Sequence, residues 1–279
     1  MNRVDHGVYA RADLVAKFDV RALRLAAGLA VVGPEAVGSH FDAAIVHGLP
    51  LLDRPPATVT VTRPPGTSGG WSRRPSLRVR AVALPPAQVT RRNGLPVTSV
   101  ARTVVDLART TPFRSGVVAA DCALHLGKTT NAELAVVIAT CARWPGVGRA
   151  RRVVEFSDGR SESPFESIAR VAFRDGGLPP PELQVWVGGD AGPVGRADFL
   201  WREHGTIAEA DGALKYADPD RARQQLRRDA DLREAGFEVV HFGWAELTLT
   251  PHRVIHAIRA AFARAGTLRA GDLARRRSA

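Results

Sequence analysis

The stretch Arg196-Ala-Asp-Phe-Leu-Trp-Arg-Glu-His-Gly-Thr-Ile-Ala-Glu-Ala-Asp-Gly212 decides the fold of the second part of this 279-residue chain. Two apolar, strand-like runs flank the turn-like residues 202–205, a pattern that predicts a β-hairpin. A loop of two or four residues places Asp198 directly opposite Glu209, and the Cβ atoms of cross-strand partners lie about 5 Å apart. Asp211 falls two residues further along, on the same face of its strand.

These three carboxylates interrupt apolar runs, and a buried carboxylate is costly unless something compensates its charge. A divalent cation such as Mg²⁺ or Mn²⁺ is one such partner. Lys215 follows the hairpin. It is one of only three lysines in a chain in which arginine is the usual cationic residue. A lysine beside carboxylates suits a metal-dependent site that handles phosphate. A structural alternative stays open, because Asp198 can pair with a neighbouring arginine and Asp211 can belong to an ordinary turn.

The composition is that of a soluble globular protein, with 45% hydrophobic and 24% charged residues. No apolar run approaches the roughly 20 residues that cross a membrane, and the N-terminus lacks the apolar segment of a signal peptide. Cys122 and Cys141 are isolated, which predicts neither a zinc site nor a disulfide framework. We therefore expect a cytoplasmic protein that does not associate with membranes.

The net charge of +11 is unevenly distributed. Residues 1–160 hold 22 Lys and Arg against 11 Asp and Glu, whereas residues 161–279 hold 17 of each. An excess confined to one part is typical of a domain that meets a polyanion, and predicts DNA as a partner. The candidate phosphate-binding side chains are Arg78, Arg80, Arg91 and Arg92. Arginine on a solvated surface is the alternative.

Hydrophobic periodicity predicts a mixed α/β (α+β) chain. In the first part we expect helices at residues 19–32, 40–48, 99–109, 114–126 and 130–142, and strands at 58–62 and 77–84. Thr130 and Glu133 form a capping box. Residues 145–148 break the pattern and place the domain boundary near residues 145–160.

The second part follows the order αβββαβα. The expected elements are a helix that begins at Ser163 and stops at Gly176, strands at 183–187, 194–201 and 206–211, a helix at 220–235, a strand at 237–242 and a helix at 251–263. Trp186, Trp201 and Trp244 are expected in the core. The predicted divisions are residues 1–155, residues 156–265 and a flexible basic tail at 266–279.

Several motifs of the second part occur in the order found in a known group. Ser163-Pro-Phe-Glu166, Asp198, Glu209-Ala-Asp-Gly212, Lys215-Tyr216 and Leu232-Arg-Glu-Ala-Gly-Phe-Glu-Val-Val240 resemble the very-short-patch-repair-endonuclease-like domain of the PD-(D/E)XK nuclease superfamily. The resemblance covers residues 160–265 and implies the superfamily core of a helix, a three-strand meander, a helix and a further strand.

That resemblance also implies roles for the carboxylates. Asp198 and Glu209 would bind Mg²⁺ or Mn²⁺, Asp211 would complete the shell, and Lys215 would contact the phosphate. Glu166 would be the helix-borne catalytic acid, although Ser163 and Glu166 also fit a capping box. One departure is that Asp211 stands where the superfamily's motif has lysine.

The first part resembles a different group. Ser39-His-Phe-Asp-Ala-Ala-Ile-Val-His-Gly-Leu-Pro50 and Thr98-Ser-Val-Ala-Arg-Thr-Val-Val-Asp-Leu-Ala-Arg109 are similar to the abortive-infection type IV antitoxin family. That likeness implies a toxin partner and a winged helix at the N-terminus. Arg3-Val-Asp-His-Gly-Val-Tyr9 is similar to the last strand of such a wing, so either the chain starts upstream or the segment that reads DNA has been lost.

Two functions follow from these patterns. The first is a metal-dependent endonuclease that hydrolyses DNA phosphodiester bonds, with the basic first domain holding the substrate. The alternative is a non-enzymatic DNA-binding regulator or antitoxin in which the nuclease-like domain is a degenerate scaffold. The sequence is silent on the oligomeric state.

Overall fold

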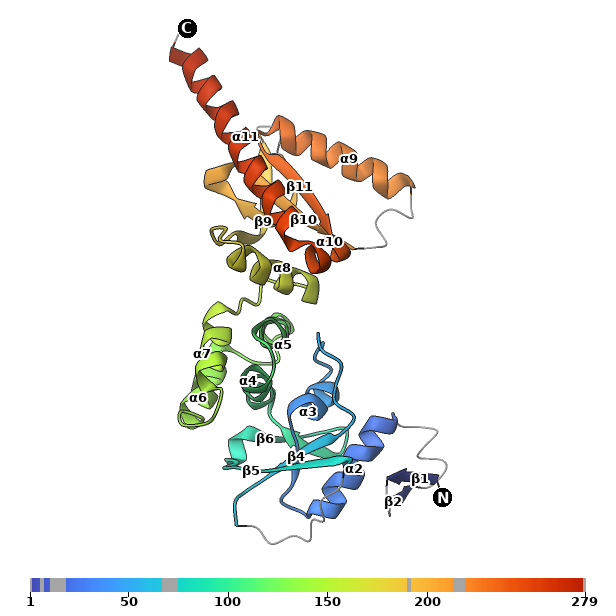
Figure 1. Ribbon diagram of the computed structural model, residues 1–279. Helices are drawn as coiled ribbons and strands as arrows, with labels where there is room; N and C mark the ends of the chain where they lie inside the picture. Colours follow the sequence, from blue (N-terminus) through green and yellow to red (C-terminus); the bar gives the residue numbers. More distant parts are fainter. Residues whose placement is uncertain are drawn as a thin grey trace. The chain divides into compact units, whose positions relative to one another are not determined.

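The computed structural model describes residues 2–5, 8–10, 19–66, 75–189, 192–212 and 219–277. The chain divides into two compact units, Met1–Gly159 and Arg160–Ala279 (Figure 1). Each unit combines helices with a mixed β-sheet, which confirms the predicted fold class.

The first unit is built on a five-stranded sheet with the strand order β5-β4-β3-β7-β6. The strands are β3 (Val37–Gly38), β4 (Val59–Arg63), β5 (Leu77–Ala81), β6 (Val89–Arg92) and β7 (Leu95–Thr98). β4 and β5 are parallel, as are β3 and β7, while the other two pairs are antiparallel. A small separate hairpin, β1 (Asn2–Asp5) with β2 (Val8–Ala10), replaces the single strand expected at residues 3–9.

A tight turn joins β6 to β7. Arg92 pairs with Leu95, which leaves Asn93 and Gly94 as a two-residue loop. Both loop residues have positive φ, 51° and 78°, as a type I′ hairpin turn requires. Asparagine and glycine are the residues that adopt this backbone most readily.

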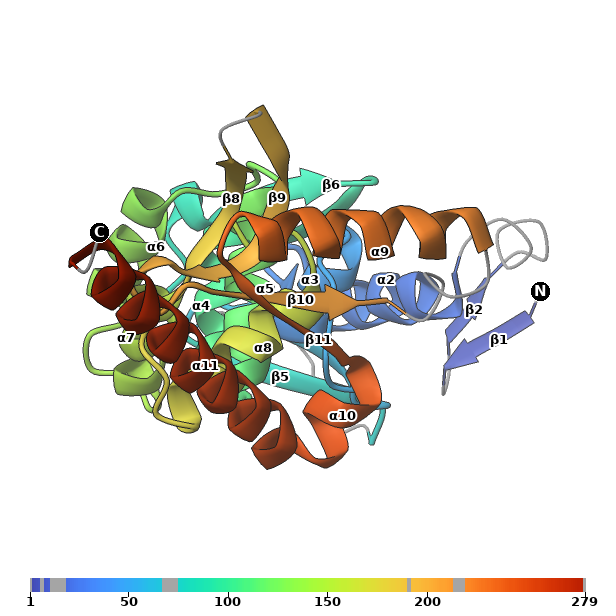
Figure 2. The same ribbon diagram turned by 90° about the horizontal axis from the view of Figure 1, so that it is seen from above.

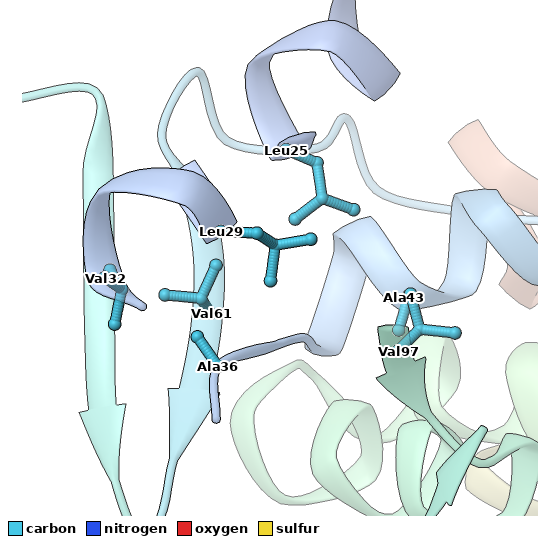
Figure 3. Packing of buried hydrophobic residues seen from close by; sticks show 7 residues of the cluster. All are labelled: Leu25, Leu29, Val32, Ala36, Ala43, Val61 and Val97. Carbon is cyan, nitrogen blue, oxygen red and sulfur yellow. The ribbon is translucent and has the colours of Figure 1, made fainter. Parts of the chain in front are cut away.

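One face of the sheet packs against α2 (Val20–Val32). Leu25, Leu29 and Val32 recur at helical spacing and contact Val61 and Val97 of the strands (Figure 3). Because side chains alternate along a strand, the residues between the core positions of β4 and β5 project from the other face. These residues are Thr60, Thr62, Arg78 and Arg80.

The described residues of the first unit also form the short α3 (His40–His47) and the helices α4 (Val100–Thr110), α5 (Phe113–His125), α6 (Asn131–Thr140) and α7 (Val147–Phe156). The capping box of Thr130 and Glu133 is present at the start of α6, as predicted. The first unit continues past the break at residues 145–148 and ends at Gly159, inside the range 145–160 given for the domain boundary. Gly146 (φ 82°) precedes α7 and packs so closely on the Arg109 carbonyl that a Cβ would collide with it.

The second unit has the strand order β11-β10-β9-β8. Its elements are α8 (Pro164–Asp175), β8 (Glu182–Gly189), β9 (Gly192–Trp201), β10 (Thr206–Asp211), α9 (Pro219–Glu234), β11 (Glu238–Gly243), α10 (Trp244–Leu249) and α11 (Pro251–Arg277). The predicted order of elements is confirmed, with α10 missed. α11 continues to Arg277, so the residues expected as a flexible tail extend a helix.

Helices cover both faces of this sheet, and α9 and α11 lie on opposite sides of β10 and β11 (Figure 2). On one face, Trp201 contacts Phe173 of α8 and Phe262 of α11. On the other, Leu200 packs with Leu232 of α9. Trp201 is in the core as expected. The same prediction was wrong for Trp186 and Trp244, whose exposed fractions are 69% and 46%.

Candidate functional site

The hairpin that carries the carboxylates has the predicted four-residue loop. Trp201 pairs with Thr206 and the register continues to Phe199 and Ala208. Beyond this pair, Asp198 Oδ2 accepts a hydrogen bond from the Ala210 backbone N–H at 3.0 Å. Asp198 Oδ1 accepts from the Gln184 side-chain amide at 3.2 Å. Each oxygen of Asp198 therefore accepts one hydrogen bond from the protein itself.

Glu166 lies near Asp198, because the Gln184 amide also donates to Glu166 Oε2 at 2.9 Å. Glu166 is equally part of the helix cap. Its backbone N–H donates to Ser163 Oγ at 3.1 Å, and its carboxylate accepts from Ser163 Oγ at 2.8 Å and from the Glu162 N–H at 2.9 Å. Burial raises the pKa of Glu166, against the lowering effect of these hydrogen bonds. Half of the capping box predicted as the alternative is present: Ser163 Oγ accepts from the Glu166 N–H, but the Glu166 carboxylate accepts from the N–H of Glu162 instead of that of Ser163.

Arg228 of α9 supplies the cation beside Glu209. Arg228 Nη2 donates to Glu209 Oε1 at 2.9 Å, and the Glu209 side chain is only 3% exposed. Burial acts to lower the pKa of Arg228, but hydrogen bonding and attraction to Glu209 raise it overall. The guanidinium also donates to the Arg196 carbonyl and lies so close to Gly195 that a Cβ there would collide with Arg228 Nε. Gly195 thus makes room for the arginine.

Asp211 belongs to a second ionic group. His241 Nδ1 lies 3.2 Å from Asp211 Oδ2, and His241 Nε2 lies 2.8 Å from Asp229 Oδ2. The Asp211 carboxylate is the largest cause of a raised pKa of His241, and Asp229 acts in the same direction. The imidazole consequently links β10, β11 and α9, and its two carboxylate contacts favour the protonated form.

Protein side chains contact the carboxylates that were expected to bind a metal ion. Within residues 160–189, 192–212 and 219–277, no three His, Cys, Asp or Glu side chains are grouped as an ion would need. Gln184, Arg228 and His241 instead contact the carboxylates through which a metal would be bound. Lys215 lies outside the described residues. Mg²⁺ or Mn²⁺ binding stays a prediction that the observed partners do not favour.

The four candidate DNA-binding arginines lie on two different strands. Arg78 and Arg80 belong to β5, and Arg91 and Arg92 to β6, which are the two opposite edges of the five-stranded sheet. Arg78, Arg91 and Arg92 are exposed, while Arg80 is half-buried. A duplex lying along one edge would therefore meet one pair and not the other.

An ionic network that the sequence did not reveal lies in α4. Arg102 Nε donates to Asp106 Oδ2 at 2.9 Å, and each side chain is only 1% exposed. Arg102 Nη1 also donates to Gln88 Oε1 at 2.6 Å. The guanidinium carbons of Arg102 and Arg109 lie 4.6 and 4.9 Å from the centre of the Trp144 ring. Residues 102, 106 and 109 are spaced so that they lie on one face of the helix. The sequence alone did not indicate that this face is buried, because a charged helical face is ordinarily solvated.

His40 lies beside this network. Burial lowers the pKa of His40 from its usual 6.5 to about 4. Of the charges around it, Asp106 raises the pKa and three arginines lower it: Arg80, Arg109 and Arg102. The imidazole is therefore neutral at physiological pH.

This shift predicts a pH dependence of stability. Because the folded-state pKa lies below the unfolded one, the contribution of neutral His40 is present above pH 6.5 and is lost as pH falls from 6.5 to 4. At about 1.4 kcal/mol per pKa unit, the loss is about 3 kcal/mol. His40→Asn, which tolerates the positive φ of 55° at this position, should show a correspondingly shallower decline. Urea unfolding of both proteins between pH 7 and 4.5 measures it, and equal declines would contradict the assignment.

Comparison with known proteins finds a family match within the first unit. Residues 36–156 match the family model described as the AbiEi antitoxin C-terminal domain, which confirms the antitoxin resemblance for that stretch. The match does not reach the carboxylates of the second unit. Among the described residues, no helix is both long enough and apolar enough to cross a membrane.

Two relatives extend the comparison over both units. They are Uncharacterized protein Rv2248 of Mycobacterium tuberculosis strain ATCC 25618 / H37Rv and Uncharacterized protein MT2308 of strain CDC 1551 / Oshkosh. Each is 31% identical over 240 residues, which is 85% of this chain and 83% of the relative. The chain belongs to the same family as these mycobacterial proteins.

Proposed function

We propose that this protein is a non-enzymatic, DNA-binding regulator of the antitoxin kind, and that its second unit is a degenerate nuclease-like scaffold. The observation that carries the proposal is the match of residues 36–156 to the AbiEi antitoxin C-terminal domain. The confinement of the net charge of +11 to residues 1–160 supports DNA as a partner. The antitoxin family implies a protein toxin as the second partner. The protein would bind both DNA and the toxin in the cytoplasm.

The contacts of the carboxylates support the scaffold role of the second unit. A catalytic metal needs carboxylate oxygens that are free to bind it and a water molecule that it can activate. Here Asp198 accepts two hydrogen bonds, and Glu209 is neutralised by Arg228. An arginine already present beside a buried carboxylate supplies the charge compensation that a cation would otherwise give.

The scaffold role predicts no metal-dependent cleavage. Supercoiled plasmid, linear duplex and single-stranded DNA should remain intact when the full chain is incubated with Mg²⁺ or Mn²⁺ and resolved by gel electrophoresis. Glu209→Gln serves as the matched control, because it removes the charge and keeps the shape. Cleavage by the wild type that is lost in Glu209→Gln would establish the endonuclease hypothesis instead.

DNA binding is tested separately through the two edges of the sheet. Arg78→Gln/Arg80→Gln and Arg91→Gln/Arg92→Gln each remove two positive charges from one edge. The variant at the edge that contacts DNA should bind every duplex more weakly, and the slope of log K against log salt should flatten by about 0.9 for each phosphate that the variant no longer neutralises. Fluorescence anisotropy between 50 and about 200 mM salt measures both quantities.

A third double variant controls for total charge. Arg151→Gln/Arg152→Gln removes the same charge from exposed positions of α7. If all three double variants lose the same affinity, the binding follows net charge alone and neither edge is the contact surface. Wild-type binding that is undetectable even at low salt would overturn the DNA-binding proposal.

A further inference from the structure

The face of the first unit's sheet that lies opposite α2 carries an unusual concentration of buried positive charge. We define the arginine cluster as Arg80 of β5, Arg102 and Arg109 of α4, and His40 at the start of α3. Arg102 is 1%, His40 5% and Arg109 8% exposed. The residues come from three elements that the chain brings together from positions 40 to 109.

The cluster has more N–H donors than acceptors. Among the described residues, the buried atoms Arg80 Nε, Arg102 Nη2, Arg109 Nε, Arg109 Nη1 and His40 Nε2 have no hydrogen-bond partner. A buried donor without an acceptor costs about 1–3 kcal/mol, and more when it is charged. Native structures satisfy nearly all such groups, so a set of five unpaired donors calls for an acceptor.

The tautomer of His40 follows from its neighbours. Ser39 Oγ accepts a hydrogen bond from Thr62 Oγ1 at 2.8 Å, so its own proton is available to His40 Nδ1, 3.0 Å away. A neutral imidazole that accepts at Nδ1 carries its hydrogen on Nε2. The unpaired His40 Nε2 is therefore a donor, like the guanidinium atoms of the cluster.

The charge is also unbalanced. Asp106 is the carboxylate that acts on both His40 and Arg80, and its Oδ2 already accepts from Arg102 Nε at 2.9 Å. Burial lowers the pKa of Arg80, and repulsion from Arg78 and Arg109 lowers it further. Three guanidinium groups against this carboxylate leave an excess of two positive charges in a largely buried place. The indole of Trp144, which holds Arg102 and Arg109 by cation–π contact, adds no negative charge.

We propose that the arginine cluster binds a small tetrahedral oxyanion of the phosphate class. Arginine N–H groups pair with phosphate oxygens in charge-assisted hydrogen bonds, and several arginines can share one such anion. Arg80 is the half-buried member of the cluster and marks the side from which the anion enters. The buried position of the other members selects for an inorganic anion or a single terminal phosphate group over the backbone of a duplex.

Calorimetric titration of the full chain tests this proposal. Sodium phosphate at constant ionic strength should bind saturably to one site per chain, and Arg109→Gln and Arg80→Gln should each weaken binding at least tenfold. Arg151→Gln is the matched control, because it removes the same charge from an exposed position on α7. A second titration with adenosine 5′-monophosphate separates the two sources: binding of both ligands assigns a phosphate-ester site, and binding of phosphate alone assigns an inorganic-ion site.

A second measurement covers the case in which Arg109→Gln fails to fold. Phosphate should raise the thermal unfolding midpoint of the wild type and not that of the more accessible Arg80→Gln, while chloride at the same ionic strength changes neither. The proposal is overturned if the wild type shows no saturable phosphate binding, or if Arg80→Gln binds phosphate as the wild type and Arg151→Gln do. Such a result would leave ordered water as the acceptor of the unpaired donors.

Discussion

Asp106→Ala should lower the free energy of unfolding of the first unit by about 3–5 kcal/mol, the range for breaking a buried ion pair by removing one partner. Asp106 and Arg102 are each 1% exposed and joined at 2.9 Å. Removing the carboxylate leaves Arg102 uncompensated among two further guanidinium groups. Most of this loss of stability comes from leaving the buried charge of Arg102 without its carboxylate, and less comes from the broken hydrogen bond.

A double variant separates these two contributions. Arg102→Met removes the stranded charge and keeps most of the side-chain volume, so Asp106→Ala/Arg102→Met should be more stable than Asp106→Ala alone. Glu155→Ala, an exposed carboxylate on α7, should change the stability by less than about 0.5 kcal/mol. Hydrogen exchange of the α4 amides, followed by mass spectrometry, reports the stability of this unit separately. Unchanged exchange of α4 in Asp106→Ala would contradict the expectation.

Most elements of the second unit, and α6 of the first, could be predicted because their signals are local. The four-residue loop at 202–205, flanked by apolar runs, fixes the register of Trp201 against Thr206. Ser163 and Thr130 precede helices that begin where the capping signals place them. Each prediction needed only residues that are neighbours in the chain.

The sequence did not predict the elements that depend on residues with an unusual backbone conformation. Gly146, which looks like a domain break, is the residue before α7, because its positive φ and missing Cβ let it approach the carbonyl of Arg109. β6 and β7 are only four residues each. The Asn93-Gly94 pair between them is the sequence signal from which their hairpin could have been predicted.

The candidate site shows the same limit. The hairpin register from Trp201–Thr206 to Phe199–Ala208 is readable from the sequence, but the partners of Asp198 and Glu209 are not. Gln184 comes from β8 and Arg228 from α9, and no local pattern distinguishes these two residues from solvated polar ones. Whether a carboxylate pair meets a metal or an arginine depends on such long-range contacts, and the sequence pattern of the carboxylates is the same in both cases.

The pairing of Glu209 with arginine leads to a second large effect. Arg228→Met should destabilise the second unit by about 3–5 kcal/mol, because it removes the guanidinium from a carboxylate that is only 3% exposed. Glu209→Gln should cost less, since Arg228 is 22% exposed and water can solvate its freed donors. The double variant Arg228→Met/Glu209→Gln should recover part of the stability lost in Arg228→Met. The glutamine amide is uncharged, so no buried charge is left without its arginine.

A matched control lies on the same helix. Arg223 pairs with Asp220 at 3.1 Å, but these side chains are 72% and 81% exposed. Arg223→Met should therefore change stability by about 0–1 kcal/mol. Hydrogen exchange of the β10 amides in the wild type and the four variants measures the differences, with and without Mg²⁺. If Arg228 takes the place of a cation beside Glu209, Mg²⁺ leaves the exchange of wild-type β10 unchanged; slower exchange on adding Mg²⁺ would show that the carboxylates still bind a metal and would reopen the endonuclease hypothesis.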